Sequence, residues 1–334
     1  MYERFYGFRE LPFDLTPNPR RLVATDVHRE ALSTFEYAIA SRTGIALLIG
    51  EAGTGKTTVI RAAIEKQAGQ AHCIHLDNPA LTREEFVEML AVRFGLSARA
   101  RRSKTRLLLE LEELLRQRSA RRETTVLIID EAQSLTIELL EEIRLLANLE
   151  TNDEKLLSVV IAGQPEMADR LNDRVLRQLK QRVALRCELR PLTAKETIGY
   201  VAGRIQAVGG VPARVFTAEA VTLIAERSGG IPRTINVIAD NALLGGFAAE
   251  QRPVTCQLVR EVCRDFDIKA SHAVDSRGRS ARPQADPPPD GGGDDGAREQ
   301  PDGPGRTDTA PFHQILRRLR RMPLFRPQWR SSSY

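Results

Sequence analysis

The sequence predicts an α/β domain built on a parallel β-sheet, followed by a small all-helical domain and a disordered C-terminal tail. Residues 44–190 alternate short β-branched runs with amphipathic helical patterns, which is typical of parallel strands joined by helical crossovers. Two of these runs, Ala46–Ile49 and Val126–Ile129, are continuously apolar, as expected of strands buried on both faces. Residues 191–269 show helical patterns only.

The individual elements follow from hydrophobic periodicity and capping signals. Five strands are expected, at Gly44–Ile49, Ala71–Leu76, Val126–Ile129, Leu157–Ala162 and Val183–Leu189. Helices are expected at His28–Arg42, Thr82–Phe94, Thr193–Ala207, Thr217–Arg227, Pro232–Phe247 and Val254–Phe266. Two of these helices open with a capping box, formed by Thr82 with Glu85 and by Thr193 with Glu196.

The chain divides into five predicted segments. Residues 1–43 are an N-terminal entry segment, 44–190 the α/β core, and 191–269 a helical lid. Residues 270–310, rich in Pro, Gly and Asp, are expected to be a disordered linker because they cannot bury enough apolar area to offset ordering entropy. Residues 311–334 form a basic amphipathic tail, in which Phe312, Ile315, Leu316 and Leu319 share one helical face among arginines. That pattern fits a helix that binds an anionic membrane or a partner, and equally a solubilising end.

Composition indicates a globular chain that needs no disulfide to form a core. The 334 residues are 42% hydrophobic and 28% charged, with a net charge of +5 and four cysteines outside any CxxC pair. The first residues lack the apolar run of a signal peptide, and no stretch is long and apolar enough to span a bilayer. We therefore expect a cytoplasmic protein, either free or peripheral at the inner face of the cytoplasmic membrane.

Two charged or polar clusters are interpreted as structural. The basic run Arg99–Arg106 has no interleaved aromatic residues for base stacking, so a solvated loop is favoured over a nucleic-acid contact. His72 and His75 flank Cys73 on an apolar strand, where packing is favoured over metal binding because the spacing supplies too few ligands.

A phosphate-binding loop follows the first predicted strand. The segment Gly50–Thr57, GEAGTGKT, fits G-x-x-x-x-G-K-[ST] and directly precedes a helical run. Glycines let backbone N–H groups surround a phosphate, and the helix directs its positive end at the anion. Lys56 is expected to reach the β- and γ-phosphates of ATP, and the Thr57 hydroxyl to ligate Mg²⁺. The residues expected to bind the nucleotide are Gly50, Glu51, Ala52, Gly53, Thr54, Gly55, Lys56, Thr57 and Thr58.

Two acids lie at the tip of the third predicted strand. An acid is costly at the end of a buried strand unless it faces a cation, so Asp130 is expected to hold Mg²⁺. Glu131 beside it is the expected general base for the attacking water. This pair favours ATP hydrolysis.

Three further residues are candidates for the γ-phosphate. Gln164 follows the fourth predicted strand, where an amide meets either the reacting atoms or simply opens a turn with Pro165. Arg182 precedes the fifth strand, and Arg233 lies at the start of a predicted lid helix. Arginine forks stabilise phosphoryl transfer, although a single arginine is more often a solvated surface charge.

Several motifs together resemble the AAA+ ATPases of the general secretion pathway protein A family, and the related ATPases of pilus biogenesis and exosortase-linked polysaccharide loci. They are YERFYGFRELPF from Tyr2, HREAL from His28, the phosphate-binding loop, DEAQ from Asp130, GQPE from Gly163, RQLKQR from Arg177 and GIPRTIN from Gly230, and they span about residues 1–267. The resemblance implies a five-stranded parallel sheet with a helical lid and nucleotide bound between them, at a subunit boundary. It also implies that Gln164 is the sensor-1 residue, Arg233 the sensor-2 arginine, and Arg182 an arginine finger acting on the neighbouring subunit, with Arg177 as the alternative.

The resemblance leaves the task of the ATPase open. It implies a homo-oligomeric enzyme that powers or organises an envelope export system of the secretion, pilus or exopolysaccharide type. Transposition ATPases are similar over much of the same core, so a DNA-binding ATPase that regulates transposition is the alternative, and a nucleotide-dependent scaffold is a third. Members of the secretion family often carry a membrane segment and a peptidoglycan-binding domain after the lid, whereas a linker and a basic tail are expected here.

Overall fold

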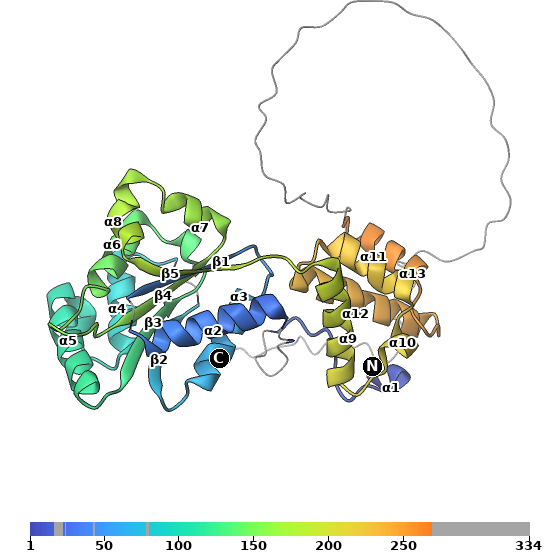
Figure 1. Ribbon diagram of the computed structural model, residues 1–334, viewed down its shortest axis with the longest axis horizontal. Coiled ribbons are helices and arrows are strands. Elements are labelled where there is room, and N and C mark those ends of the chain that lie inside the picture. Colours follow the sequence, from blue (N-terminus) through green and yellow to red (C-terminus); the bar gives the residue numbers. More distant parts are fainter. Residues whose placement is uncertain (17–22, 24, 43, 78–79, 269–334) are drawn as a thin grey trace, which may run out of the picture.

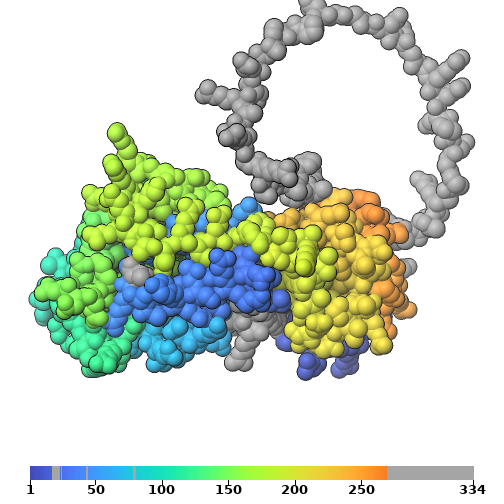
Figure 2. All heavy atoms as spheres, viewed as in Figure 1, coloured from blue at the N-terminus to red at the C-terminus, as the bar shows by residue number. Residues whose placement is uncertain are grey.

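The described residues form a sheet domain and a helical domain that lie side by side. The computed structural model describes residues 1–16, 23, 25–42, 44–77 and 80–268. The predicted linker 270–310 and tail 311–334 lie outside these residues. The chain leaves the sheet domain after its last strand and enters the helical domain directly (Figure 1), and the two domains touch in the space-filling view (Figure 2).

A five-stranded parallel sheet forms the centre of the first domain. Its strands are β1 (Ile45–Gly50), β2 (Ala71–Leu76), β3 (Thr124–Ile129), β4 (Ser158–Gly163) and β5 (Val183–Leu189), in the order β2-β3-β4-β1-β5. Every neighbouring pair is parallel. The five-stranded sheet predicted from the sequence is confirmed. The bounds of β2 and β5 and the end of β3 are those predicted, and the remaining strand ends are shifted by one or two residues.

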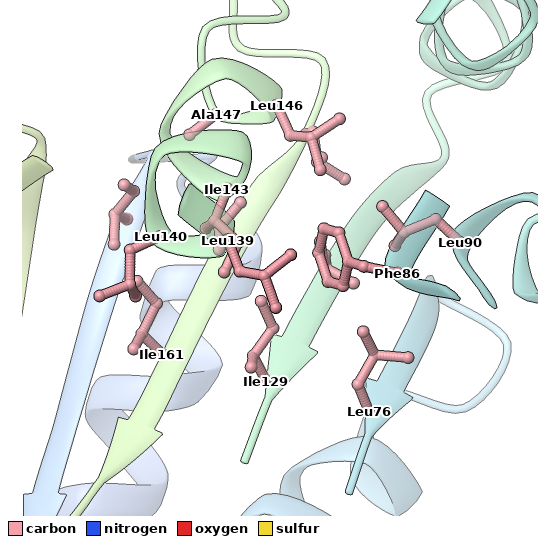
Figure 3. Packing of buried hydrophobic residues seen from close by; sticks show 14 of the residues in the cluster. Leu76, Phe86, Leu90, Ile129, Leu139, Leu140, Ile143, Leu146, Ala147 and Ile161 are labelled. Atoms are coloured by element: carbon pink, nitrogen blue, oxygen red, sulfur yellow. The ribbon is translucent and has the colours of Figure 1, made fainter. Parts of the chain in front are cut away.

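Helices cover both faces of this sheet. One face packs on α2 (Asp26–Ala40) and α3 (Lys56–Lys66); the other packs on α4 (Arg83–Arg93), α5 (Lys104–Ala120), α6 (Ile137–Leu146), α7 (Pro165–Arg170) and α8 (Arg177–Gln181). Successive side chains of a strand point to opposite faces, so Ile129 joins the core under α4 and α6 while Ile128 joins the core under α2 and α3. Figure 3 shows Phe86 of α4 and Leu139 of α6 against Ile129. Burying such a side chain contributes about 1.5–3 kcal/mol.

Short 3₁₀ turns complete the connections of the sheet domain. They are η2 (Ala100–Arg102), η3 (Ala132–Ser134) and η4 (Arg174–Leu176). The basic run Arg99–Arg106 is therefore not the loop that we expected, because η2 and the first turn of α5 run through it. Lys104 forms an ion pair with Glu142 of α6, whereas Arg101 and Arg102 are exposed.

The helical domain consists of five helices and the N-terminal residues. Its helices are α9 (Ala194–Ala207), α10 (Pro212–Val215), α11 (Ala218–Ser228), α12 (Pro232–Ala248) and α13 (Cys256–Asp265). The predicted capping boxes of α4 and α9 are both present. The helix α1 (Glu3–Tyr6) begins the chain, and the side chains of Tyr6 and Phe13 are buried in the core of the helical domain.

The N-terminal entry segment contributes to both domains. Residues 1–14 are held to the helical domain by Arg204, whose Nε donates a hydrogen bond to the Pro12 carbonyl at 2.6 Å. The following helix α2 packs instead on the sheet. Its bounds, Asp26–Ala40, are two residues earlier than the predicted His28–Arg42. The segment thus connects the helical domain to the sheet from the N-terminal side, as the link after β5 does from the other.

The remaining composition-based expectations concern membranes and metals. In the described part of the chain, no helix combines the length and apolarity needed to cross a bilayer. Across the same residues no group of three or more His, Cys, Asp or Glu side chains is arranged to hold a metal ion. His72 is exposed and pairs with Glu123, so the packing expected for it is wrong, because β2 is an edge strand. His75 is partly buried and pairs with Asp77.

Candidate nucleotide-binding site

The predicted phosphate-binding loop connects β1 to α3 at the carboxyl edge of the sheet. Gly53 and Gly55 have φ angles of 84° and 102°, in the left-handed region that favours glycine. The Thr54 hydroxyl donates a hydrogen bond to the Glu51 carbonyl at 2.8 Å and closes the loop on itself. A Cβ at Gly55 would lie 3.0 Å from Nε2 of His28, so this position also requires glycine for space.

Lys56 lies beneath this loop. Its side chain is 4% exposed, and Nζ donates hydrogen bonds to the carbonyls of Gly50 at 2.8 Å and Glu51 at 3.1 Å. Burial lowers the pKa of the ammonium, and the nearby carboxylates of Glu131 and Asp130 oppose that shift. The lysine therefore places a positive charge at the base of the loop, with acids on its other side.

Thr57 and Asp130 form an oxygen pair beside Lys56. Asp130 directly follows β3 and is 2% exposed, and its Oδ2 accepts a hydrogen bond from the Thr57 hydroxyl at 2.6 Å. One hydroxyl and one carboxylate are the hard oxygen ligands that Mg²⁺ takes from a protein when phosphates and water supply the rest. The donor set at this position fits Mg²⁺, and both oxygens come from residues that the sequence nominated as ligands.

Two amides hold the carboxylate of Glu131. Its Oε2 accepts hydrogen bonds from Nε2 of Gln133 at 2.6 Å and from Nε2 of Gln164 at 3.4 Å. Oε1 of Gln133 in turn accepts the backbone N–H of Gln164 at 3.1 Å. Gln133 thus bridges the ends of β3 and β4. The candidate residue Gln164 does lie beside Glu131, while Gln133 was missed as a site residue although it stands inside the DEAQ motif.

The backbone of Glu131 reinforces this orientation. Its φ angle is 54°, an uncommon conformation for a residue with a side chain. The N–H of Glu131 donates to Oδ1 of Asp130 at 2.9 Å. Downstream, the Arg170 guanidinium donates to the carbonyls of Gln133 and Leu135, both at 2.8 Å, which fixes the turn η3. The two acids are therefore held by side chains from several elements.

A cavity of about 350 Å³ lies between the two domains at this edge of the sheet. From the sheet domain, the predicted residues that line it are Gly53, Gly55, Lys56, Thr57, Thr58 and Glu131. The backbone of the predicted loop is completed by Gly50, Glu51, Ala52 and Thr54. On the opposite side the cavity is lined by residues of the helical domain and the N-terminal segment, among them Tyr200, Arg233 and Thr16.

Arg233 joins the helical domain to the loop. It is the second residue of α12, and its backbone N–H donates to the Gly53 carbonyl at 3.2 Å. A Cβ at Gly53 would lie 2.8 Å from Cβ of Arg233, so the two backbones approach closely. The structure therefore brings this predicted arginine to the cavity.

Arg182 does not reach the cavity of its own chain. It precedes β5, and the first residue of β5 pairs with Ile45, at the opposite end of β1 from Gly50. Five residues of strand separate these ends by roughly 17 Å. Both Arg182 and the alternative Arg177 are exposed. Arg182 could therefore contact a nucleotide only in the cavity of another molecule.

Comparisons with known proteins agree with this geometry. Residues 39–171 match the family model described as AAA domain. General secretion pathway protein A of Aeromonas hydrophila is 40% identical over 250 residues, which cover 74% of this chain and 45% of that protein. The chain thus spans less than half the length of this curated relative.

Solved structures share the fold. The ORC2 protein of Aeropyrum pernix, in ADPNP and ADP complexes, aligns with a TM-score of 0.60 and 16% identity over 79% of this chain and 74% of its own. Cdc6p of Pyrobaculum aerophilum aligns with a TM-score of 0.54 and 18% identity, over 75% of this chain and 70% of its own. Drosophila ORC bound to DNA gives a TM-score of 0.55 and 21% identity, over 78% and 64% of the respective chains. These structures support the fold alone. The match to the AAA domain model and the 40% identity with general secretion pathway protein A show that, over the aligned residues, the chain belongs to the AAA+ ATPase family of general secretion pathway protein A.

Proposed function

We propose that the chain binds ATP with Mg²⁺ in the cavity between its domains and hydrolyses it to ADP and phosphate. One observation carries this proposal. The Thr57 hydroxyl donates a hydrogen bond to Asp130 beside a cavity that Lys56 and Glu131 also line. Loop N–H groups and Lys56 would hold the phosphates, and Thr57 and Asp130 would hold Mg²⁺. When bound, Mg²⁺ neutralises the charge on the phosphate oxygens.

The chemical step follows from the position of Glu131. Its carboxylate accepts a proton from water, while the water oxygen forms a bond to the γ-phosphorus and the bond to the oxygen bridging the β- and γ-phosphorus breaks. ADP carries away the electron pair of that bond. Gln164 stabilises the carboxylate through its amide, and Arg233 faces the same cavity from the helical domain. Charge spread over the γ-phosphate would be stabilised by Arg182 of a neighbouring subunit in a homo-oligomer.

Turnover of ATP by the full chain tests this proposal. Purified protein should release phosphate from ATP only when Mg²⁺ is present, and chelation should stop the reaction. Lys56→Ala should lose ATP binding because the buried charge at the base of the loop is removed. A wild-type chain that binds no nucleotide would overturn the proposal.

We extend the proposal to a role in an envelope export system of the secretion, pilus or exopolysaccharide type. The support is the identity shared with general secretion pathway protein A. In this role the protein is cytoplasmic, and its partner is a component of the export machinery. Export genes beside the gene for this chain would support the role, whereas a neighbouring transposase gene would oppose it.

Residues 312–334 bear on where the ATPase acts, although they lie outside the described residues. We propose that this basic tail binds the anionic inner face of the cytoplasmic membrane, since each arginine near such a surface contributes about 1 kcal/mol. The test compares full-length protein with a chain ending at Ala270 on anionic and neutral vesicles. Tail-dependent binding to anionic vesicles that fades with salt is expected, and equal sedimentation of both chains would contradict it.

A DNA-binding ATPase that regulates transposition is the second candidate function. It is favoured by the exposed arginines of the run Arg99–Arg106, and one structural neighbour is bound to DNA. ATP-dependent binding to duplex DNA with a steep salt dependence, retained after removal of the tail, would support it. Absence of such binding leaves the export role.

A further inference from the structure

His28 connects the N-terminal segment to the phosphate-binding loop. The side chain lies in the first turn of α2, is 3% exposed and lines the cavity. Its Nε2 lies 3.1 Å from the Thr54 carbonyl oxygen, and its Nδ1 lies 2.6 Å from the Thr25 hydroxyl. A buried imidazole with a partner on each ring nitrogen is held in one orientation.

The chemistry of these partners decides which nitrogen carries the proton. A carbonyl oxygen can only accept, so Nε2 must carry hydrogen and donate to Thr54. Nδ1 then accepts the hydrogen bond from the Thr25 hydroxyl, which can both donate and accept. Burial lowers the pKa of His28 and so favours this neutral form.

The Thr25 hydroxyl contacts His28 and does not cap the helix α2. It occupies the N-cap position of α2 with an extended backbone, where threonine usually accepts a hydrogen bond from the first turn of the helix. Among the described residues, no backbone N–H of that turn donates to the Thr25 side chain. Orienting the imidazole therefore takes the place of capping the helix.

The hydrogen bond to Thr54 fixes one peptide group of the loop. In a trans peptide the carbonyl of Thr54 and the N–H of Gly55 point in opposite directions. With the carbonyl held by His28, the Gly55 N–H is directed away from the imidazole. Gly55 itself lines the cavity, and its φ of 102° together with the 3.0 Å approach of His28 to an added Cβ favours glycine at this position.

We propose that His28 is a positioning residue for phosphate binding, which sets the Thr54–Gly55 peptide so that the Gly55 N–H donates to the phosphates of the nucleotide. This inference rests on the proposed function, since it assumes that the loop binds nucleotide. It gives the HREAL segment a role in nucleotide binding, because His28 orients a peptide group of the phosphate-binding loop.

Two substitutions of similar size separate the two ring nitrogens. The side-chain amide of glutamine reaches the position of Nε2, so His28→Gln retains the donor to Thr54. Asparagine reaches only the position of Nδ1, so His28→Asn retains the contact with Thr25 and loses the donor to the loop. Affinity of the full chain for ADP, measured by calorimetry with Mg²⁺, is the readout, because it requires no hydrolysis.

The expected results differ between the two variants. His28→Asn should weaken ADP binding about tenfold, the loss that one buried hydrogen bond represents, while His28→Gln should stay within about threefold of wild type. Without nucleotide, both variants should still unfold in one cooperative thermal transition above the temperature of the calorimetry, with His28→Asn melting lower because the buried Thr54 carbonyl loses its donor. Thr25→Val is a second variant, for the case that His28→Asn impairs folding. It keeps the imidazole but removes the hydrogen bond to Nδ1, and it should weaken ADP binding about threefold.

Three outcomes would overturn the inference. One is unchanged ADP affinity in His28→Asn, and another is an equal loss in the Gln and Asn variants, which would indicate a packing role. The third applies if His28→Asn folds poorly, and it is an unchanged affinity for ADP in Thr25→Val. A wild-type chain that does not bind ADP would overturn the proposed function itself.

Discussion

At the scale of single residues, side-chain amides and hydroxyls orient the charged groups of the site. The side chain of Gln133 forms two hydrogen bonds, to the Glu131 carboxylate and to the Gln164 backbone. A carboxylate left without such donors samples several rotamers, and only some direct it at a water beside the γ-phosphate. The activity of Glu131 should therefore depend on a residue that never contacts the nucleotide.

We predict that Gln133→Leu lowers kcat for ATP hydrolysis about tenfold while KM changes little, because orientation of the base is lost and binding is retained. Steady-state kinetics checks this. The matched control is Gln117→Leu, which removes the same type of hydrogen bond, to Glu113, from the exposed surface of α5. In a Glu131→Gln background, Gln133→Leu should cause no further loss. An additional loss there, or a higher KM alone, would contradict a role through Glu131.

Sequence reasoning identified the site residues whose roles can be recognised from a short local motif. Lys56, Thr57, Asp130 and Glu131 occupy the positions at the edge of the sheet that the motifs indicated. Gln133 and His28 were quoted as part of longer motifs but not recognised as site residues. Their contacts, to Gln164 and Thr54, join segments that are distant in the sequence, so periodicity and spacing could not reveal them.

At the scale of elements, local signals set where helices begin. Thr193 and Glu196 form the predicted capping box of α9, and Arg190 adds an ion pair to Glu196. The capping box was predictable because its two residues lie three apart in the sequence, whereas the ion pair with Arg190 was not predicted. The strand ends that shifted by one or two residues are set by pairing with neighbouring strands, which a local pattern does not contain.

The Glu196 carboxylate should make the helical domain sensitive to acid. Its hydrogen bonds with Arg190 and Thr193 lower its pKa to about 2. A carboxyl whose pKa is depressed by folding stabilises the folded state fully above its unfolded pKa, about 4.3, and loses that contribution as the pH falls toward 2. Glu196→Gln should therefore lower the melting temperature at pH 7 and flatten its dependence on pH between about 4.5 and 2.

Thermal melts of the wild type and Glu196→Gln over this pH range provide the measurement. The control is Glu219→Gln, which replaces an acid in the first turn of α11 and should leave the wild-type slope in place. Parallel pH profiles for wild type and Glu196→Gln would show that this capping box does not contribute to acid sensitivity.

At the scale of the whole molecule, contacts between distant segments bring the helical domain to the loop. Arg204 holds the Pro12 carbonyl, and the Arg233 N–H meets Gly53. Helical periodicity predicted the helices of the lid but not that residues 1–14 pack on them. The same geometry leaves Arg182 at the far end of the sheet from its own cavity, so the arginine-finger role proposed for it would require a second subunit.

Mixing inactive subunits tests this arrangement. Arg182→Ala should lower turnover by at least about 10³-fold, the lower end of the contribution of arginine fingers. Adding Lys56→Ala subunits should restore part of the activity, because they supply Arg182 to a neighbour with an intact loop. Arg186→Ala, an exposed arginine on β5, should behave as wild type. Wild-type activity in Arg182→Ala, or specific activity that does not change on dilution of the wild type, would refute action between subunits.

The most direct test of ATP hydrolysis at this site is the comparison of ATP binding and turnover in Glu131→Gln. The substitution removes the group that accepts a proton from water and keeps Lys56, Thr57 and Asp130 in place. We expect ATP affinity within about threefold of wild type and a turnover reduced by at least about 10²-fold, the usual contribution of a general base. Hydrolysis by Glu131→Gln at the wild-type rate would contradict the account.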